Sequence, residues 1–304
     1  MFPYIGGKKQ HSKWIDPFFP ENTTKYVEVF GGAMWMYWMS GKLPATVNVY
    51  NDFNRHLANV FLCSSTDPWR MEQTCLSYYK DIGNGDKFIE YRDEVFAVYN
   101  QKFNMPDYHL AAKYMLLQMQ IFSGGNGLTD KTKMYHNDNY KPKFKTFTEK
   151  FQQVKYLDKL GHLTVENMDC RDLIRKYDHA DTFFYIDPPY FKLESYYTED
   201  EFGKLDHIEL LEMLKHTKGK WALSYYHFAE LETMLPRDKY HWHEEVTYTN
   251  NGLKKQEGAV RKDGKMGTGV RPERTELLIM NYNPEDVVEP MNNFNELFEE
   301  EGTL

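Results

Sequence analysis

The sequence predicts an α/β fold in which an open, mostly parallel sheet carries helices on both faces. Short apolar or β-branched runs at residues 25–30, 46–50 and 182–186 have the length and composition of buried strands. The first two runs are each followed by a glycine or polar turn and then by a helical pattern. Strands that alternate with helices in this way are typical of parallel sheets.

The composition fits a globular protein. The chain has 304 residues, enough for one large domain or two, and its 41% apolar and 16% aromatic residues exclude wholesale disorder. A formal charge of −8 argues against a wholly basic nucleic-acid binder. Seven acids and no base lie in residues 285–304, a segment expected to be solvated, so the rest of the chain carries a charge of −1.

Several classes of site and location are not favoured by the sequence. The three cysteines form no CxxC pair, which favours a reducing, intracellular setting. The sequence also lacks an HExxH motif, so it does not predict a metal site. No apolar run reaches about 18 residues, and the N-terminus does not have the pattern of a signal peptide. We therefore expect a cytoplasmic protein without a membrane span or a metal, acting as a monomer or a weak dimer.

The first two strands each end in a turn suited to a ligand. Gly31-Gly32 follows the strand at residues 25–30 and opens an apolar helix at 34–39, where a nucleotide-like ligand lies in open α/β folds. Close helix–sheet packing is an equally good explanation of these glycines. Asp52 ends the second strand 20 residues after Gly32, where Rossmann-like folds hold ribose hydroxyls. Asp52 could instead cap the helix at residues 55–62.

The middle of the chain changes character. Residues 63–120 have mostly helical patterns, with an amphipathic helix at 107–120. From residue 121 to 150 a glycine-rich start leads into a segment where aromatic residues interleave with lysines, and residues 123–155 carry a local charge of +4. The aromatic residues of this segment are Tyr135, Tyr140, Phe144 and Phe147. Such a loop suits phosphate contact and base stacking, although a solvated loop face explains it equally well.

The stretch Asp187-Pro188-Pro189-Tyr190 follows the apolar strand at residues 182–186. The two prolines fix φ and disfavour helix before them, which predicts a stiff, extended elbow. This elbow can present the Asp187 carboxylate, the Pro188 carbonyl and the Tyr190 ring in one geometry. That set suits a planar ring with an exocyclic amino group, because the two oxygens can accept its hydrogens while the aromatic ring stacks on its face.

The remaining segments complete the α/β pattern. A strand at residues 163–165 ends near Asp169, which could border a ligand or cap the next helix. Helices are expected at 151–160, 206–218 and 228–235, and strands at 221–225 and 276–280. Residues 249–274 are rich in glycine, lysine and arginine, with a second local charge of +4, and predict a basic loop that grips phosphates.

The ordered motifs resemble those of the DNA adenine methylase (Dam) family, S-adenosylmethionine-dependent enzymes of bacteria and phages. The resemblance covers most of residues 4–282. It depends on four stretches: Gly6-Gly7-Lys8, Glu28-Val29-Phe30-Gly31-Gly32-Ala33, Asn51-Asp52-Phe53-Asn54 and Asp187-Pro188-Pro189-Tyr190. It implies a Rossmann-like class I methyltransferase sheet, formed by residues 1–60 and 151–283. Residues 61–150 would be an inserted, mostly helical DNA-recognition domain with a hairpin or loop, followed at 284–304 by an acidic tail.

The resemblance also implies roles for individual residues. Catalysis would use Asp187, Pro188, Pro189 and Tyr190. The S-adenosyl-L-methionine cofactor would be bound by Tyr4, Gly7, Lys8, Glu28, Phe30, Gly31, Gly32, Ala33, Asp52, Asp169, Cys170 and Asp187. Double-stranded DNA would be contacted by Lys9, Asn126, Lys131, Lys133, Tyr135, Lys141, Lys143, Lys262 and Arg271. The expected product is N6-methyladenine, made from a base that is flipped out of the duplex.

One departure from the family pattern concerns the recognition hairpin. Between Arg92 and Arg171 the chain has no arginine, although arginine is the commonest reader of guanine in the major groove. The GATC target is therefore not carried over from the family, and a different target or loose recognition stays open. Two alternatives stay open at this point: the same chemistry on RNA adenine or on the cytosine amino group, and a catalytically silent nucleic-acid-binding homologue.

Overall fold

The structure, a computed structural model, describes residues 8–98, 105–121, 129, 131–135, 140–190, 202–248 and 273–287. It contains a seven-stranded sheet in the order β3-β2-β1-β4-β5-β7-β6. The strands are β1 (Lys25–Glu28), β2 (Val47–Asn51), β3 (Leu163–Glu166), β4 (Thr182–Ile186), β5 (Lys220–Tyr225), β6 (His241–Tyr248) and β7 (Glu273–Met280). The α/β fold predicted from the sequence, a mostly parallel sheet with helices on both faces, is confirmed.

The sheet is parallel through its first five strands and antiparallel at one edge. β1 lies between β2 and β4, with Glu28 opposite Tyr50 on one side and Tyr185 on the other. β7 inserts antiparallel between β5 and β6. The sequence does not predict β6, because the alternating polar residues around His241-Trp242-His243 resemble a surface segment. An edge strand of this kind has one solvated face and lacks the apolar run that marks a central strand.

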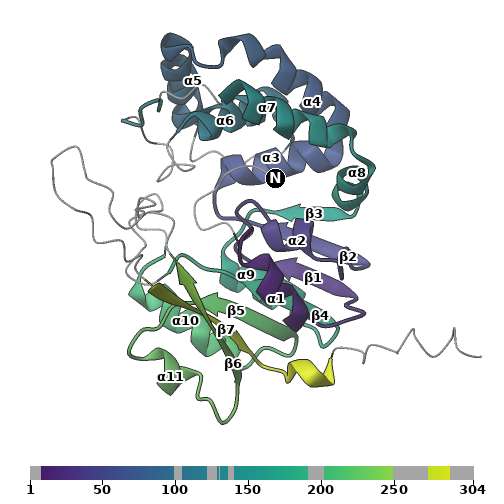
Figure 1. Cartoon of the computed structure of the whole chain (residues 1–304), viewed down its shortest axis with the longest axis vertical. Helices are drawn as coiled ribbons and strands as arrows, with labels where there is room; N and C mark the ends of the chain where they lie inside the picture. Colours follow the sequence, from purple (N-terminus) through teal and green to yellow (C-terminus); the bar gives the residue numbers. More distant parts are fainter. Residues whose placement is uncertain are drawn as a thin grey trace, which may run out of the picture.

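Eleven α-helices and several short 3₁₀ turns are found in the described ranges (Figure 1). The helices are α1 (Ser12–Ile15), α2 (Trp35–Met39), α3 (Arg55–Thr66), α4 (Pro68–Ser77), α5 (Gly85–Ala97), α6 (Tyr108–Gln120), α7 (Tyr140–Thr148), α8 (Val154–Gly161), α9 (Cys170–Tyr177), α10 (Lys204–Leu214) and α11 (Leu231–Met234). The 3₁₀ turns include η1 (Asp16–Phe18), η2 (Tyr79–Asp81), η4 (Glu149–Gln152) and η6 (Pro284–Asp286). In the described residues, no helix is both long and apolar enough to cross a membrane.

Side chains of the strands alternate between two buried clusters, as the period of a β-strand requires. On one face Tyr26 and Tyr185 pack with residues of α1, α2 and α3. On the other face Val27 and Phe184 pack with residues of α9, α10 and α11. Every side chain of β4 is buried, which explains the continuous apolar run in its sequence.

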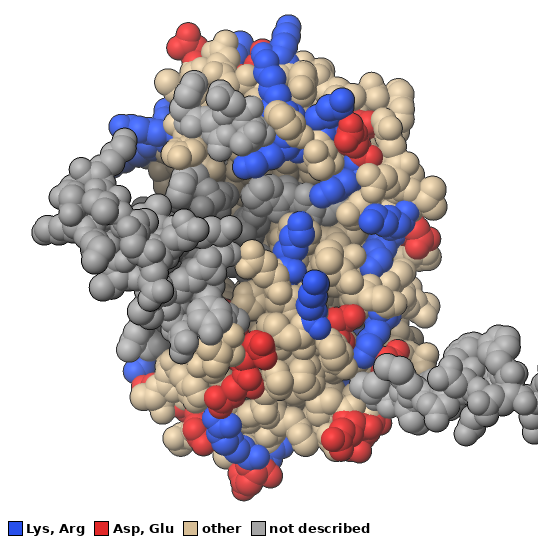
Figure 2. Space-filling view, in the orientation of Figure 1, with Lys and Arg blue, Asp and Glu red and all other residues tan. Residues whose placement is uncertain are grey.

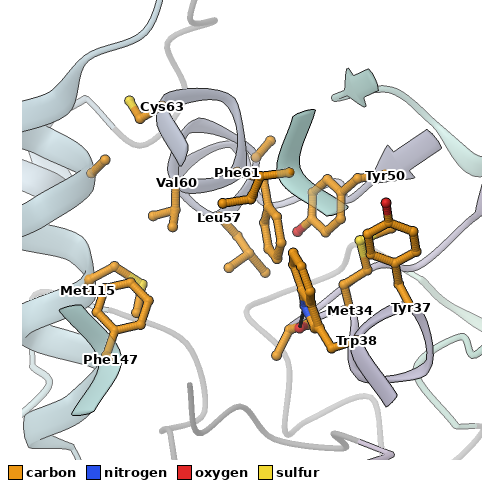
Figure 3. Packing of buried hydrophobic residues seen from close by; sticks show 14 of the residues in the cluster. Met34, Tyr37, Trp38, Tyr50, Leu57, Val60, Phe61, Cys63, Met115 and Phe147 are labelled. Carbon is orange, nitrogen blue, oxygen red and sulfur yellow. Dashed lines mark hydrogen bonds between the residues drawn. The ribbon is translucent and has the colours of Figure 1, made fainter. Parts of the chain in front are cut away.

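Helix α3 joins the sheet to the helices α4 to α7 (Figure 1). Its Phe61 ring stacks on Tyr50 of β2, with the ring centroids 3.9 Å apart. Val60 of the same helix points toward Met115 and Phe147 (Figure 3). One continuous apolar cluster therefore spans the sheet and the helices α4 to α7. The domain boundaries at residues 60 and 151 stay a prediction.

The basic, aromatic segment after residue 121 is only partly a loop. Residues 140–148 form α7, and its Phe144 and Phe147 are 1% and 3% exposed. The expectation that these two aromatic residues belong to a loop suited to base stacking was therefore wrong, since they are part of the core. A helix with apolar residues three apart explains the same pattern, because they fall on one face while the lysines stay in solvent.

Candidate active site

The predicted ligand-binding turns meet at one edge of the sheet. From β1 the chain continues through β2 to β3 on one side, whereas β4 leads to β5 on the other side. In open α/β sheets a ligand crevice lies outside the carboxyl ends of the strands where the order reverses. At this edge Gly31-Gly32 follows β1, Asp52 follows β2, Asp169 follows β3 and Asp187 follows β4.

The glycine turn after β1 has a fixed shape. The Gly31 N–H donates to the Asn51 carbonyl at 2.6 Å, and a Cβ on Gly31 would overlap the Tyr50 ring. Gly32 has φ +49°, and buried Met34, the N-cap residue of α2, has φ +55°. Positive φ is costly for a residue such as methionine, and strained positions of this kind cluster at ligand sites. The helix begins at Trp35, one residue later than expected.

Asp52 is bound to backbone donors of this turn and of the next helix. Its Oδ2 accepts from the Gly32 N–H at 2.8 Å, and its Oδ1 accepts from the Asn54 N–H at 2.8 Å. Burial raises the pKa of Asp52 to about 6, while the two backbone N–H groups oppose this increase. A separate residue, Asn54, caps α3 by accepting from the Leu57 N–H. Asn54, not Asp52, is therefore the N-cap residue of α3.

Two asparagines connect the strand ends at this site, and neither had been assigned a role from the sequence. The Asn51 amide donates to the Val29 carbonyl at 2.9 Å, and its oxygen accepts from the Met168 N–H at 3.0 Å. It thereby ties the ends of β1, β2 and β3. The Asn167 amide donates to the Asp52 carbonyl at 2.7 Å. A polar residue directly at a strand end was the available signal for both.

Asp187 lies in a cluster built from three distant parts of the chain. The Lys8 ammonium is 3.0 Å from Asp187 Oδ1, and the Tyr190 hydroxyl lies 3.0 Å from the same oxygen. Lys8 also donates to the Tyr190 hydroxyl. Glu276 of β7 completes the cluster, with its Oε2 3.0 Å from the Tyr190 hydroxyl. The family resemblance assigned Lys8 to the cofactor, and nothing in the sequence assigned a role to Glu276.

The cluster sets the charge of the Asp187 carboxyl. Burial raises its pKa to about 6, the Lys8 ammonium lowers it, and the Glu276 carboxylate raises it. The side chain of Asp187 is 16% exposed, so part of the carboxylate faces solvent. Asp187 is therefore an ionised acceptor near neutral pH at the end of β4.

The Tyr190 ring is tightly surrounded. The residue is 8% exposed, and its ring centroid lies 4.2 Å from Tyr226 and 5.5 Å from Tyr225. The Lys8 ammonium is 4.5 Å from the ring centroid. Pro188 is buried and Pro189 is half-buried in the same elbow, which has no helix or strand structure. Stacking of a base on Tyr190 stays a prediction.

Glu28, Phe30 and Ala33 border the glycine turn. Glu28 is 3% exposed and accepts from the Tyr26 hydroxyl at 2.7 Å. Burial raises the pKa of Glu28 to about 8, so the carboxyl is neutral at pH 7. Phe30 is half-buried with its ring edge-on to Phe202, and Ala33 is buried. Contacts of these three residues with a cofactor stay predictions.

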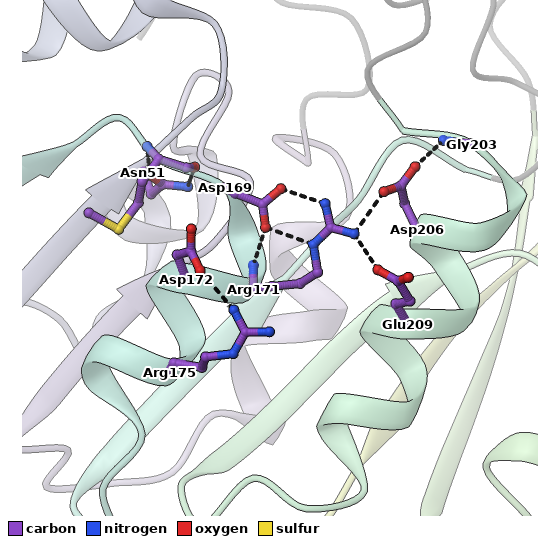
Figure 4. A network of polar contacts seen from close by, with 9 residues as sticks. Asn51, Asp169, Arg171, Asp172, Arg175, Gly203, Asp206 and Glu209 are labelled. Carbon is purple, nitrogen blue, oxygen red and sulfur yellow. Dashed lines mark hydrogen bonds and ion pairs between the residues drawn. The ribbon is translucent and has the colours of Figure 1, made fainter.

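Asp169 caps α9 and is held by Arg171 (Figure 4). Asp169 Oδ2 accepts from Arg171 Nη2 at 2.7 Å, and this pairing lowers the pKa of Asp169. The other arm of the guanidinium binds Asp206 at 2.8 Å and also Glu209. Arg171 therefore joins the starts of α9 and α10. Next to Asp169, Cys170 is buried, and burial raises the pKa of its thiol to about 12.

The predicted DNA contacts lie partly within the described residues. Lys131, Lys133 and Tyr135 are exposed, whereas Thr132 and Met134 between them are half-buried. Arg92 donates to the Thr132 carbonyl at 3.1 Å, and the Tyr135 N–H donates to the Gln120 carbonyl at 2.8 Å. Both contacts hold this segment against α5 and α6.

The other predicted contact residues are more scattered. Lys9, Lys141 and Lys143 are exposed. Figure 2 shows basic side chains over the upper and middle part of one face and acidic ones gathered toward its lower end. The predicted residues Tyr4, Gly7, Asn126, Lys262 and Arg271 lie outside the described residues. In the described part of the chain, no group of His, Cys, Asp and Glu side chains could hold a metal ion.

Comparison with known proteins gives two matches. The model of a family described as D12 class N6 adenine-specific DNA methyltransferase matches residues 4–251. The modification methylase StsI of Streptococcus sanguinis is 22% identical over 221 residues, which are 69% of this chain and 31% of that protein. The chain thus spans about a third of the length of this relative.

Proposed function

The chain belongs to the D12 class of N6 adenine-specific DNA methyltransferases, and from this premise we propose how its site works. The protein would bind S-adenosyl-L-methionine at the glycine turn and methylate the amino group of an adenine flipped out of double-stranded DNA. The observation that carries the proposal is the meeting of Gly31-Gly32, Asp52 and Asp187 at the point where the strand order reverses. The reaction would take place in the cytoplasm of a bacterium or a phage-infected host.

The residues around Asp52 fit the nucleoside part of the cofactor. Each carboxylate oxygen of Asp52 accepts one backbone N–H and keeps capacity for a ribose hydroxyl. Phe53, the next residue, is 50% exposed and offers an apolar ring beside it. A large exposed aromatic ring next to a half-buried carboxylate suits an adenine above its ribose. When bound, the cofactor supplies an electrophilic methyl group on a sulfonium.

The residues around Asp187 fit the amino group of the target base. An aryl amine is a poor nucleophile because its lone pair is delocalised into the ring. Asp187 and the Pro188 carbonyl would accept its two hydrogens, which favours a pyramidal nitrogen whose lone pair can attack. The ionised Asp187 also stabilises the positive charge that develops on this nitrogen. Positioning of the two partners would supply most of the remaining rate.

The base must leave the duplex before it reaches Asp187, at a cost of a few kcal/mol. Stacking on the Tyr190 ring would offset this with about 1–3 kcal/mol. Because Tyr190 is 8% exposed without DNA, the proposal requires its neighbours to open when the base enters.

DNA binding would use the exposed lysines of the helical part. Three exposed side chains of this segment would face a DNA groove or the phosphate backbone, namely Lys131, Lys133 and Tyr135. The hydrogen bond from Arg92 to the Thr132 carbonyl fixes the backbone between them. If lysines supply these contacts, the logarithm of the DNA affinity falls linearly as the logarithm of the salt concentration rises. Fluorescence anisotropy with a labelled duplex between about 50 and 200 mM salt measures this slope. A flat response would remove these lysines from the DNA contacts.

Methylation of a random-sequence duplex library tests the proposal. The purified protein is incubated with the library and S-adenosyl-L-methionine, and the products are analysed as nucleosides and by mapping of modified positions. We expect N6-methyladenine in one sequence context, and none with Asp187→Ala. Methylated cytosine in the library, or methylation of an RNA incubated in parallel but not of the DNA, would assign a different substrate. Absence of both methylation and cofactor binding in calorimetry would leave a silent homologue.

A further inference from the structure

Glu276 is a buried carboxylate next to the predicted catalytic residues. It lies on β7, the antiparallel strand near the edge of the sheet, and is 3% exposed. A buried carboxylate is costly unless it is paired and hydrogen-bonded. Its position therefore requires specific partners.

Those partners are the same two groups that bind Asp187. Glu276 Oε2 is 3.0 Å from the Tyr190 hydroxyl and 3.7 Å from the Lys8 ammonium. Both groups lie 3.0 Å from Asp187 Oδ1. The phenol and the ammonium thus lie between two carboxylates that come from β7 and from the end of β4.

The contacts of this cluster use one of the two Asp187 oxygens. The Tyr190 hydroxyl has one proton and two carboxylate neighbours, and Lys8 provides further donors to the shared oxygens. All of these contacts reach Asp187 through Oδ1. No hydrogen bond or ion pair joins Asp187 Oδ2 to another described residue. Among the described contacts, Oδ2 is therefore the Asp187 oxygen that keeps its capacity for a ligand.

We propose that Glu276 is a positioning residue for methyl transfer, which holds the Tyr190 hydroxyl and the Lys8 ammonium against Asp187 Oδ1 and so leaves Oδ2 for the target amine. This inference rests on the function proposed above. Glu276 also fixes the Tyr190 ring from its far end, so that the platform for the base keeps one orientation.

The charge of Glu276 acts on Asp187 as well. The groups that face Asp187 are Lys8, Tyr190 and Glu276, with Glu28 and Tyr185 behind it on β1 and β4. His11 lies near Lys8 and Glu276. Glu276 raises the pKa of Asp187, so removal of its charge lowers that pKa. The acid side of the pH–rate profile then moves to lower pH.

The test compares Glu276→Gln with Glu245→Gln. Glu245 is directly opposite Glu276 in the β6–β7 pair, and its side chain is 44% exposed. Single-turnover methylation is measured against pH with saturating cofactor and DNA. We expect Glu276→Gln to lower the plateau rate about 10-fold, as for one lost charged hydrogen bond. The acid side of the pH–rate profile should also move to lower pH, while the affinity for the cofactor stays unchanged. Glu245→Gln should change neither quantity.

A double-mutant cycle with Tyr190→Phe tests the route through the hydroxyl. Tyr190→Phe keeps the ring and removes the group that Glu276 binds, so Glu276→Gln should cost less in this background. Independent, multiplicative losses in rate, or an acid limb that stays in place, would overturn the proposal. Glu276→Asp, which keeps the charge, should keep the limb near its original pH while lowering the rate.

A measurement without turnover separates this inference from the proposed function. The carboxyl carbon of Asp187 is titrated by NMR in protein labelled at aspartate, and is assigned with Asp187→Asn. A lower pKa of Asp187 in Glu276→Gln supports the coupling even if the wild type methylates no DNA. An active wild type with an unchanged titration of Asp187 in the variant rejects the role of Glu276 alone.

Discussion

Asp52 and Asp187 end neighbouring parts of the same sheet, and both have a pKa raised to about 6 by burial, yet they are held by different kinds of partner. Backbone N–H groups of Gly32 and Asn54 hold Asp52. Side chains hold Asp187, namely those of Lys8 and Tyr190, with Glu276 behind them.

This difference suits two different tasks. Backbone donors lie within two residues of Asp52 or across a turn fixed by Asn51, so they cannot rearrange without unfolding the local structure. That suits binding of a constant ligand. Side chains from positions 8, 190 and 276 bring one cation and one carboxylate close to Asp187, so its charge depends on theirs. Asp187 therefore has an environment set by ionisable side chains, whereas Asp52 has one set by the backbone.

The largest effect is expected for Asp187→Asn. The amide keeps the size of the side chain and removes the negative charge that stabilises the developing positive charge on nitrogen. We expect a loss of about 10²–10³ in single-turnover rate, comparable to removal of one preorganised electrostatic group. Cofactor affinity, measured by calorimetry, should stay within a few-fold. A variant with wild-type rate would remove Asp187 from catalysis.

Asp52→Asn should affect binding rather than chemistry. Loss of hydrogen bonds from two ribose hydroxyls to a charged acceptor should weaken the cofactor affinity about 10–100-fold. The rate at saturating cofactor should stay close to that of the wild type, so the two carboxylates separate into KM and kcat effects. An unchanged Kd in calorimetry would contradict the assignment of Asp52 to the ribose.

A third, smaller effect concerns pH. Both carboxylates must be ionised, and their raised pKa values mean that the ionised form is lost as the pH falls through about 6. At pH 5 the rate should be about 10-fold below its plateau, since one unit of pH changes the ionised fraction about tenfold. Asp52→Asn should keep the limb in kcat, because that limb reports Asp187. A profile that is flat down to pH 5 would contradict the raised pKa of Asp187.

The smallest expected effect is one on stability, and it concerns Glu28→Gln. With its pKa raised to about 8, Glu28 is protonated in the folded protein at pH 7, whereas in the unfolded chain it ionises near its usual pKa. Its stabilising contribution is full below that usual pKa and is lost as the pH rises to about 8. Glu28→Gln should therefore gain stability over the wild type between about pH 5 and 8, by roughly 1 kcal/mol per pH unit. Thermal unfolding measures this, and a constant difference would refute it.

The sequence predicted the Asp52 side of the site better than the surroundings of Asp187. Asp52 and Gly32 are joined by a spacing of 20 residues, and that spacing reflects one strand–turn–helix unit and a neighbouring strand. Glu276 is 86 residues from Tyr190 in the sequence. It lies on β7, and no local sequence pattern predicts that this strand inserts antiparallel between β5 and β6. Pairing between distant strands is decided by tertiary packing, so the contact of Glu276 could not be predicted.

The same limit applies to the helical part. The central strand β4 was clear from its apolar run, because a strand buried on both faces needs one. The segment around Phe144 was ambiguous, since lysines and aromatic residues in alternation suit a surface loop and an amphipathic helix alike. Its burial depends on α6, which supplies the opposite wall of the core.

The position of α3 limits how far the protein can be divided. Phe61 packs against the sheet, while Val60 of the same helix points toward Met115 of α6 and Phe147 of α7 (Figure 3). A shortened protein without residues 67–150 would expose that second side of α3 to water. A fragment that keeps the sheet and α3 but lacks α4 to α7 would therefore need another apolar surface to cover α3.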